Sequence, residues 1–192
     1  MQSRLFNVDT ALLTTNCVVR RFREGDGPAV LELARDSHDY LFDHYPALVK
    51  QIDGDEAAAE TFVRRCMVDW LEQRAFNFGV WDNETTNLTA YVSLHNCDWE
   101  VPAAALSLFA TPSYSRPERL TEILARVIRF GFLQLDLEKV SFLAVADNYL
   151  AQRVARKVGL SREGDLRNEF RKGSGILVDA IRFGLSRETY GE

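Results

Sequence analysis

Two spacings of apolar residues alternate along this chain. Apolar side chains that recur about every three to four positions predict an amphipathic helix, and apolar side chains that alternate with polar ones predict a strand. Flanking residues support the helices, because Asp26 is a good N-cap, Pro28 suits a first turn and Gly159 is typical of a helix end. The expected helices are one that follows Asp26, one that opens at Asp53 and carries apolar residues to Leu71, one from about 117 to 133 and one over 149–158.

Strand-like segments fall between these helices, and turn residues bound most of them. The turn-rich residues 82–84 predict a hairpin, and Lys172-Gly173-Ser174-Gly175 predicts a turn between the last two strands. The segment 37–50 has the pattern of a loop or a broken helix. The expected strands are 17–22, 76–81, 89–94, 104–111, 140–145, 165–171 and 178–185.

The order of these elements predicts a single mixed α/β domain over residues 1–192. The 192 residues are 46% hydrophobic and suffice for one sizeable core, and the chain shows neither an internal repeat nor a low-complexity linker. Helix-like and strand-like segments alternate from end to end, which favours a layered structure. The strand at 104–111, followed by a turn and a long helix, is the kind of place where α/β proteins bind ligands.

The acidic balance of the chain limits its partners. The formal net charge is −5, so the basic field that nucleic acid or an acidic membrane surface requires is absent, and a cationic acceptor suits the chain better. No apolar run approaches the roughly 20 residues of a membrane helix. The stretch from Met1 to Asn7 lacks the apolar core of a signal peptide. We therefore expect a cytoplasmic protein with neither a membrane nor a nucleic-acid partner.

Cysteine and histidine positions predict neither a disulfide framework nor a metal site. Cys17, Cys66 and Cys97 are widely spaced and include no C-x-x-C pair. His38 and His44 are six residues apart, which is not a same-face spacing on one helix. We expect ordinary histidines and no metal ligands.

The sharpest motif lies between Asp147 and Gly164. It contains an Asn, a short helix, Lys-Val-Gly-Leu and then Glu-Gly, and it is preceded by Val-Val-Arg-Arg-Phe at 18–22 and Thr-Glu-Ile-Leu at 121–124. In this order the motifs resemble the GNAT acyltransferases, most closely the branch that acetylates ribosomal-protein N-termini and spermidine. The resemblance covers nearly the whole chain.

The resemblance implies an α/β (α+β) fold with a mixed, mostly antiparallel central sheet, flanked by helices, in which one parallel strand pair splays apart. The splayed strands would be 104–111 and 140–145. In such a fold pantetheine fills the gap by pairing with strand-edge backbone, and the pyrophosphate of acetyl-CoA lies on a helix N-terminus. The implied acetyl-CoA contacts are Phe109, Ala110, Thr111, Ser115, Arg116, Arg119, Asn148 and Arg153.

The phosphate loop departs from the family pattern of Arg or Gln, x, x, Gly, x, Gly or Ala. Here the sequence is Ser-Arg-Pro-Glu-Arg-Leu, in which Glu118 replaces the first glycine and Pro117 removes an N–H donor. Ser115 and Glu118 have the spacing of a capping box, which predicts that the helix satisfies its own free N–H groups. Against this, the side chains of Arg116 and Arg119 can bind pyrophosphate without glycines.

Candidates for the chemistry follow from the demands of amine acetylation. An attacking amine must lose a proton, and a hydroxyl or amide can help the thiolate to leave. Asn148 keeps the amide of the branch, whereas Ala151 stands where the branch often has Ser. Tyr149 is then the nearest phenol that can serve the thiolate, and its alternative role is packing at the helix start.

Two acidic and aromatic segments are candidates for acceptor recognition, because both border the acceptor cleft in the resembling family. Glu100 or Asp98 can draw a proton from an amine through water, and His95 can do so near neutral pH. Glu100 is the catalytic candidate among them. The alternative is that these are solvated loop charges. The segments contain Asp36, Asp39, Tyr40, Asp43 and Tyr45, and then His95, Asp98, Trp99 and Glu100.

These residues predict an acetyl-CoA-dependent N-acetyltransferase that acts on a primary amine of a small molecule, peptide or protein N-terminus. The alternative is a catalytically silent GNAT-like domain that binds a ligand or partner, or pairs with itself as a homodimer. Pro117, Glu118 and Ala151 favour the alternative. A third hypothesis keeps the enzyme, with the pantetheine arm providing most of the donor contacts.

Overall fold

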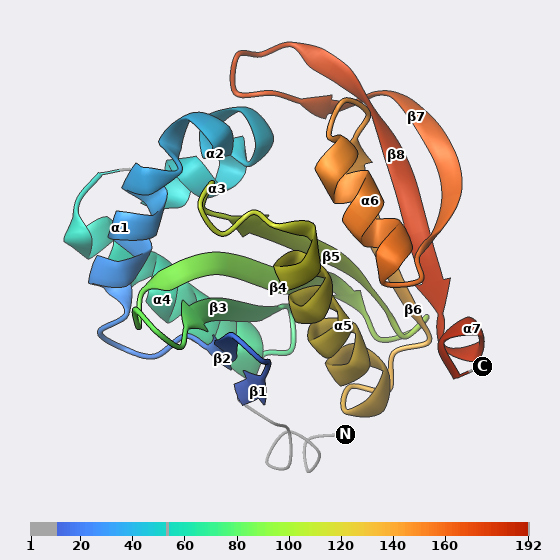
Figure 1. Ribbon diagram of the computed structural model, residues 1–192, viewed down its shortest axis with the longest axis horizontal. Coiled ribbons are helices and arrows are strands. Elements are labelled where there is room, and N and C mark those ends of the chain that lie inside the picture. Colours follow the sequence, from blue (N-terminus) through green and yellow to red (C-terminus); the bar gives the residue numbers. More distant parts are fainter. Residues whose placement is uncertain (1–10, 53, 192) are drawn as a thin grey trace.

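The computed structural model describes residues 11–52 and 54–191 (Figure 1). Asp53, which the sequence analysis places at the start of the second helix, and the stretch from Met1 to Asn7 lie outside the described residues. The elements have the predicted mixed α/β order. They are β1 (Ala11–Leu13), β2 (Cys17–Arg21), α1 (Gly27–Asp36), α2 (His38–His44), α3 (Pro46–Ile52), α4 (Glu56–Leu71), β3 (Phe76–Asp82), β4 (Leu88–Asp98), β5 (Ala103–Ala110), α5 (Pro117–Leu133), β6 (Lys139–Val145), α6 (Tyr149–Lys157), β7 (Ser161–Arg171), β8 (Leu177–Ser186) and α7 (Arg187–Gly191).

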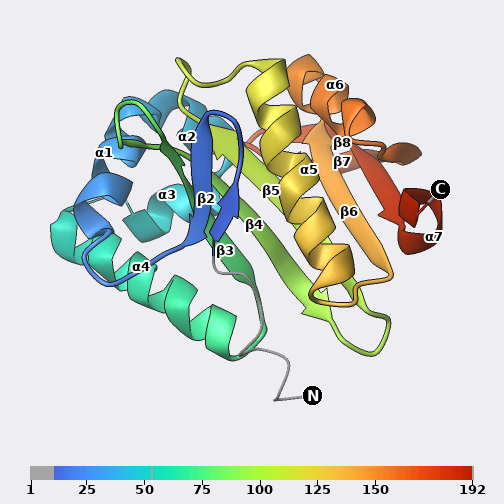
Figure 2. The same ribbon diagram turned by 60° about the horizontal axis from the view of Figure 1, so that its bottom comes forward.

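Within the described residues the strands form one sheet of eight, in the order β1-β2-β3-β4-β5-β6-β8-β7. Neighbouring strands are antiparallel except for β5 and β6, which are parallel. Parallel neighbours need a long crossover connection. Here α5 supplies it and lies across one face of the sheet (Figure 2). The predicted fold class is therefore confirmed.

Local sequence explains where several elements begin and end. Asp55 caps α4, since its carboxylate accepts a hydrogen bond from the backbone N–H of Ala58 at 2.9 Å. Gly159 lies just past α6 with φ of +89°, which glycine adopts without strain. Asp26 precedes α1 as expected but gives it no side-chain cap, because its carboxylate pairs with Arg20 at 2.8 Å.

The segment 37–50 contains a broken helix, one of the two outcomes that the sequence predicts. The backbone of Tyr45 leaves the helical region, with φ of −139°, and Pro46 begins α3. The strand β1 and the helix α7 were not predicted, because their three and five residues are too few to show a periodicity.

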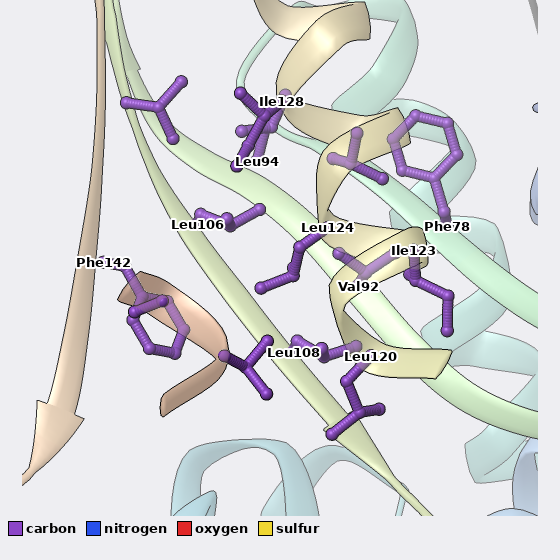
Figure 3. Close-up of a cluster of buried hydrophobic side chains, with 14 of the residues drawn as sticks. Phe78, Val92, Leu94, Leu106, Leu108, Leu120, Ile123, Leu124, Ile128 and Phe142 are labelled. Carbon is purple, nitrogen blue, oxygen red and sulfur yellow. The ribbon is translucent and has the colours of Figure 1, made fainter. Parts of the chain in front are cut away.

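Alternate residues of the central strands pack beneath α5 (Figure 3). Phe78 on β3, Val92 on β4 and Leu106 on β5 are buried in one cluster with Ile123 and Leu124 of the helix. Fully burying a side chain of this kind contributes about 1.5–3 kcal/mol. A second cluster covers part of the opposite face, where α1 and α4 contribute Val30, Leu33, Phe62 and Val63.

The strands β5 and β6 pair over only part of their length. Their parallel register ends at Leu106 opposite Phe142. Beyond this point β5 stays paired with β4 as far as Ala110, and β6 stays paired with β8 as far as Val145. Each strand is held by its outer neighbour while the two separate, and β6 diverges from β5 beside Phe142 (Figure 3). The predicted splay lies here.

Candidate active site

One edge of the β5 backbone faces the gap that opens between β5 and β6 beyond Leu106 and Phe142. The N–H of Thr111, directly after β5, donates to the carbonyl of Thr89 in β4 at 2.9 Å, and successive strand residues point their backbone groups to opposite edges. The backbone groups of Leu108 and Ala110 therefore face the gap. The carbonyl of Leu108 accepts a hydrogen bond from the phenol of Tyr45, which reaches in from the junction of α2 and α3. An extended ligand can pair with such an edge.

A cavity of about 670 Å³ opens at this place, and we call it the splay cavity. Its walls come mainly from β5 and β6. His44 and Tyr45 border it from the α2–α3 junction, and Asn148 and Ala151 border it from the start of α6. The cavity is therefore built by segments that are far apart in the sequence.

A narrow channel connects the splay cavity with the loop between β5 and α5. Asn148 and Ala151 line both spaces, which shows where they join. The channel passes Leu120 and Leu124 of α5, so it lies on the face that this helix covers. Of the predicted acetyl-CoA contacts, four line this channel: Phe109, Ala110, Ser115 and Asn148.

A row of polar residues crosses three strands on the face opposite α5. Asn77 on β3 is in register with Ser93 on β4, which is in register with Ser107 on β5. The Oδ1 atom of Asn77 accepts hydrogen bonds from the hydroxyl groups of Ser93, at 2.7 Å, and Tyr91, at 2.6 Å. This row was not predicted from the sequence. Its signal is one small polar residue in each of three mainly apolar strands.

The polar row lines a second space of about 390 Å³, the side cavity, between the sheet, α3 and α4. Five residues line both the side cavity and the splay cavity: His44, Tyr45, His95, Ser107 and Phe170. Two substrates can therefore meet at this junction, one from each cavity. Such proximity is the main requirement of a transfer reaction.

Both histidines at the junction are shifted toward the neutral form. Burial lowers the pKa of His44, and the charge of Lys172 lowers it further, while Asp147 and Asp43 act in the opposite direction. Burial also lowers the pKa of His95, against a hydrogen bond with Asn96. Neutral imidazoles can accept a proton near neutral pH. Of the two, only His95 is among the sequence-derived candidates.

Asn148 is fixed by two hydrogen bonds. Its Oδ1 accepts from the backbone N–H of Ala151 at 3.0 Å, which caps α6. This leaves its Nδ2 to donate to the phenolic oxygen of Tyr40 at 3.3 Å. The two other sequence-derived catalytic candidates lie elsewhere. Tyr149 is 77% exposed and Glu100 is exposed in the β4–β5 turn, and neither lines the splay cavity or the side cavity.

The start of α5 differs from the predicted capping box. Arg116, not Ser115, is the N-cap residue, and no side chain caps the helix. The hydroxyl of Ser115 instead donates to the carbonyl oxygens of Thr111, at 2.9 Å, and Ala110, at 3.3 Å. Pro117 at the first helical position sets the helix start one residue later. The capping-box prediction is therefore wrong.

Cationic side chains surround the start of α5. Lys157 on α6 lies 3.4 Å from Glu118. The backbone N–H of Glu118 itself, then Lys157 and Arg153, hold the pKa of the Glu118 carboxyl below its usual value. The guanidinium of Arg119 lies over the ring of Tyr114, at 4.5 Å from its centre. Arg116 and Arg153 are exposed. This cluster can hold an anionic group by side-chain contacts.

The structure gives the cysteines no reactive setting. Cys17, Cys66 and Cys97 are free, and burial raises the pKa of each thiol. Residues 11–52 and 54–191 contain no group of three or more His, Cys, Asp or Glu side chains that can hold a metal ion. In the same part of the chain, no helix combines the length and apolarity needed to cross a membrane.

The chain matches known proteins over most of its length. Residues 16–161 match the family described as "Acetyltransferase (GNAT) domain". The chain is 22% identical over 156 residues to the uncharacterized N-acetyltransferase YoaA of Bacillus subtilis, a match that covers 81% of this chain and 85% of YoaA.

Solved structures share its fold. The ribosomal-protein-S5-alanine acetyltransferase from Vibrio fischeri has a TM-score of 0.84 at 14% identity, over 95% of this chain and 99% of that one. Mycobacterium smegmatis RimJ in complex with CoA-disulfide has a TM-score of 0.81 at 14% identity, over 96% of this chain and 90% of that one. At this level of identity the similarity concerns the arrangement of the elements.

Proposed function

The chain belongs to the GNAT acetyltransferase family, and on this premise we propose that it transfers the acetyl group of acetyl-CoA to a primary amine. The observation that carries this proposal is the junction of two cavities at the end of the β5–β6 pairing. One cavity continues toward a cationic helix start and suits the donor. The other is lined by a polar row and suits the acceptor.

In this proposal the pantetheine arm of the donor lies along the free edge of β5. Its amide groups pair with the backbone of Leu108 and Ala110, in the manner of an added strand. The arm passes through the narrow channel beside Asn148 and places its thioester at the splay cavity. Thr111 follows the last residue of β5, and its backbone N–H is bonded to Thr89 and so points away from the donor. RimJ, a structural neighbour, has been solved with CoA-disulfide, which supports a CoA-type donor.

The pyrophosphate is assigned to the cationic cluster at the start of α5. A glycine loop binds phosphate by bare backbone N–H groups, which Pro117 and Glu118 reduce here. Side chains replace them in this proposal, because guanidinium and ammonium groups make charge-assisted hydrogen bonds to phosphate. The proposed contacts are Ser115, Arg116, Arg119, Arg153 and Lys157.

The side cavity is proposed to take the acceptor. Its polar row can position a peptide-like group, and its opening at His44 and His95 leads an amine toward the thioester. A neighbour with the same fold is a ribosomal-protein-S5-alanine acetyltransferase, which supports a protein or peptide N-terminus, and a small-molecule amine fits the same chemistry. The cytoplasmic location and a homodimer stay proposals too.

The second candidate function is a catalytically silent domain that binds a ligand or partner. Glu118 supports it, since a carboxylate lies at the helix start where the family places phosphate. Calorimetric titration with acetyl-CoA and with free CoA separates the two functions. Micromolar binding, followed by release of CoA thiol with an Ala-initiated peptide or spermidine, supports the enzyme. Absence of binding at both low and physiological salt contradicts it.

A further inference from the structure

The helix α2 presents two aromatic side chains to the proposed reaction site. Tyr40 and His44 are four residues apart, which places them on one face of the helix. Their ring centres are 4.5 Å apart. Tyr40 lines the narrow channel, and His44 lines both the splay cavity and the side cavity. One helical turn therefore spans the path from the donor side to the acceptor side.

The phenol of Tyr40 is arranged as a proton donor. Its oxygen accepts a hydrogen bond from Asn148, whose other amide atom is held by the backbone of α6. The phenolic proton is then directed away from Asn148. Asn148 and Ala151 mark the junction of the channel with the splay cavity, where the proposed donor places its sulfur. Tyr40 is only 36% exposed, whereas Tyr149 is 77% exposed.

The imidazole of His44 is arranged as a proton acceptor. Its Nδ1 is enclosed and has no hydrogen-bond partner among the residues that the structure describes. This leaves Nε2 as the nitrogen that can reach the cavities. The charged groups that act on the ring are Lys172 from the β7–β8 turn, Asp147 from the β6–α6 turn and Asp43 from α2, and the phenol of Tyr40 lies beside it.

The turn of the β7–β8 hairpin packs against α2 and is joined to the β6–α6 turn. Lys172 in its turn pairs with Asp147 at 3.2 Å. Gly173 lies against the carbonyl oxygen of Phe42, so close that a Cβ atom there would clash with the backbone of α2. The tip of the hairpin reaches α2 in Figure 1. The hairpin tip therefore packs against α2 at Phe42, and Asn148 at the start of α6 contacts the same helix at Tyr40.

We propose that Tyr40 and His44 are an acid–base pair for acetyl transfer, an inference that rests on the proposed function. The neutral amine attacks the thioester carbon. The amine nitrogen becomes acidic as the C–N bond forms, and His44 takes its proton. The C–S bond then breaks, and the sulfur takes the phenolic proton of Tyr40. Proton transfer from the imidazolium to the phenolate restores both residues, so the products are the N-acetyl amine and CoA thiol.

The test compares conservative variants of the 192-residue chain. Tyr40→Phe and His44→Gln are assayed for release of CoA thiol with an Ala-initiated peptide and with spermidine, and acetyl-CoA affinity is measured by calorimetry. We expect each variant to lower kcat about a hundredfold, as loss of a general acid or base does, with affinity changed less than about twofold. His38→Gln on the same helix is the control for folding and should keep full activity.

Further readouts separate a chemical role from a structural one. The kcat of the natural protein should fall at acid pH with a midpoint below the ordinary pKa of histidine, about 6.5, because burial and Lys172 lower the pKa of His44. The kcat of His44→Gln should not show this decrease at acid pH. Imidazole in the buffer should restore part of the activity of His44→Ala, and that restoration requires a folded site.

Three results overturn the inference while leaving the proposed function intact. In the first, the natural protein transfers acetyl groups and both variants keep full activity. In the second, activity is lost in Tyr149→Phe and Glu100→Gln instead. In the third, His44→Ala is well folded but imidazole does not restore its activity. A natural protein that binds acetyl-CoA but acetylates no amine overturns the proposed function itself.

Discussion

The side chains of Glu118 on the first turn of α5 and Lys157 on the last turn of α6 form an ion pair of 3.4 Å. The pair joins the two helices at the end of the narrow channel, where the proposed donor has its pyrophosphate. In this position the carboxylate competes with phosphate for both the helix N-terminus and the ammonium group. With the pyrophosphate placed as proposed, the affinity for CoA depends on how readily the pair opens.

Replacing Glu118 by Gln should strengthen CoA binding about two- to fivefold at low salt, since it removes a negative charge from the helix start and frees Lys157. Calorimetric titration with CoA measures the change. Glu56→Gln is a matched control, because Glu56 also lies in the first turn of a helix but far from this site. An equal affinity for the natural protein and Glu118→Gln would contradict the placement of the phosphate.

Replacing Arg153 by Gln should weaken acetyl-CoA binding about two- to fivefold, as expected for an exposed contact between opposite charges. The loss should shrink as salt is raised toward 1 M, because salt screens charges in solvent. Titrations at several salt concentrations measure both effects. Arg162→Gln, in the edge strand β7, serves as the control. A loss that does not depend on salt would show that Arg153 acts on the fold rather than on phosphate.

Replacing Tyr45 by Phe should lower the free energy of unfolding by about 1 kcal/mol, because the carbonyl of Leu108 loses its hydrogen bond within the splay. Saturating acetyl-CoA should reduce this difference if pantetheine supplies an N–H group to the same carbonyl. Denaturant unfolding with and without the donor measures both values. The proposed donor pose is wrong if the difference is the same in the two conditions.

Replacing Ala151 by Ser in the Tyr40→Phe background should recover kcat by about tenfold relative to Tyr40→Phe alone. The new hydroxyl would lie at the junction of the channel and the splay cavity, where it can serve the leaving thiolate. Release of CoA thiol measures the recovery. The same substitution at Ala146, which lies before α6 and does not line these spaces, should give none.

The free energy of unfolding should decrease as pH falls from 7 toward 5. Burial lowers the pKa of His44 and His95 in the folded state, so the unfolded chain binds more protons in the range just below about 6.5. The double variant His44→Gln, His95→Gln should show a smaller decrease. Unfolding by urea at several pH values measures it, and equal slopes in the two proteins would contradict the inferred neutral state of the rings.

Most of the fold follows from local sequence. Alternation of apolar and polar residues located β3 and β4 within a few residues, and the apolar face of α5 predicted its burial, because a strand or a long helix repeats its pattern over several positions. Gly159 and Gly175 adopt positive φ as their places at a helix end and in a turn predict. The capping-box prediction was wrong because Pro117 takes the first helical position, which makes Arg116 and not Ser115 the N-cap residue.

The site was less predictable. The motif around Asn148 identified one side of the narrow channel, and Ala110 and Ser115 line the same channel. Their contact with acetyl-CoA, which the resemblance implies, stays a prediction. Tyr149 is next to Asn148 in sequence, but the first turn of α6 points it to solvent, and Tyr40 from α2 takes the place beside the amide. Proximity along the chain was therefore a poor guide to proximity at the site.

The elements and their mixed α/β order follow from the sequence, because each depends on patterns within one segment or on the order of segments. The motifs around Asn148 also identify the family, and the splayed strand pair follows from that resemblance. Tertiary structure alone decided which side chains meet. Asn77, Ser93 and Ser107 become a row only through strand register. Tyr40 and His44 border the cavities through the packing of α2, which contacts the distant β7–β8 hairpin and the start of α6. The physical reason is that such contacts depend on packing between segments far apart in the chain, and no local periodicity records that packing.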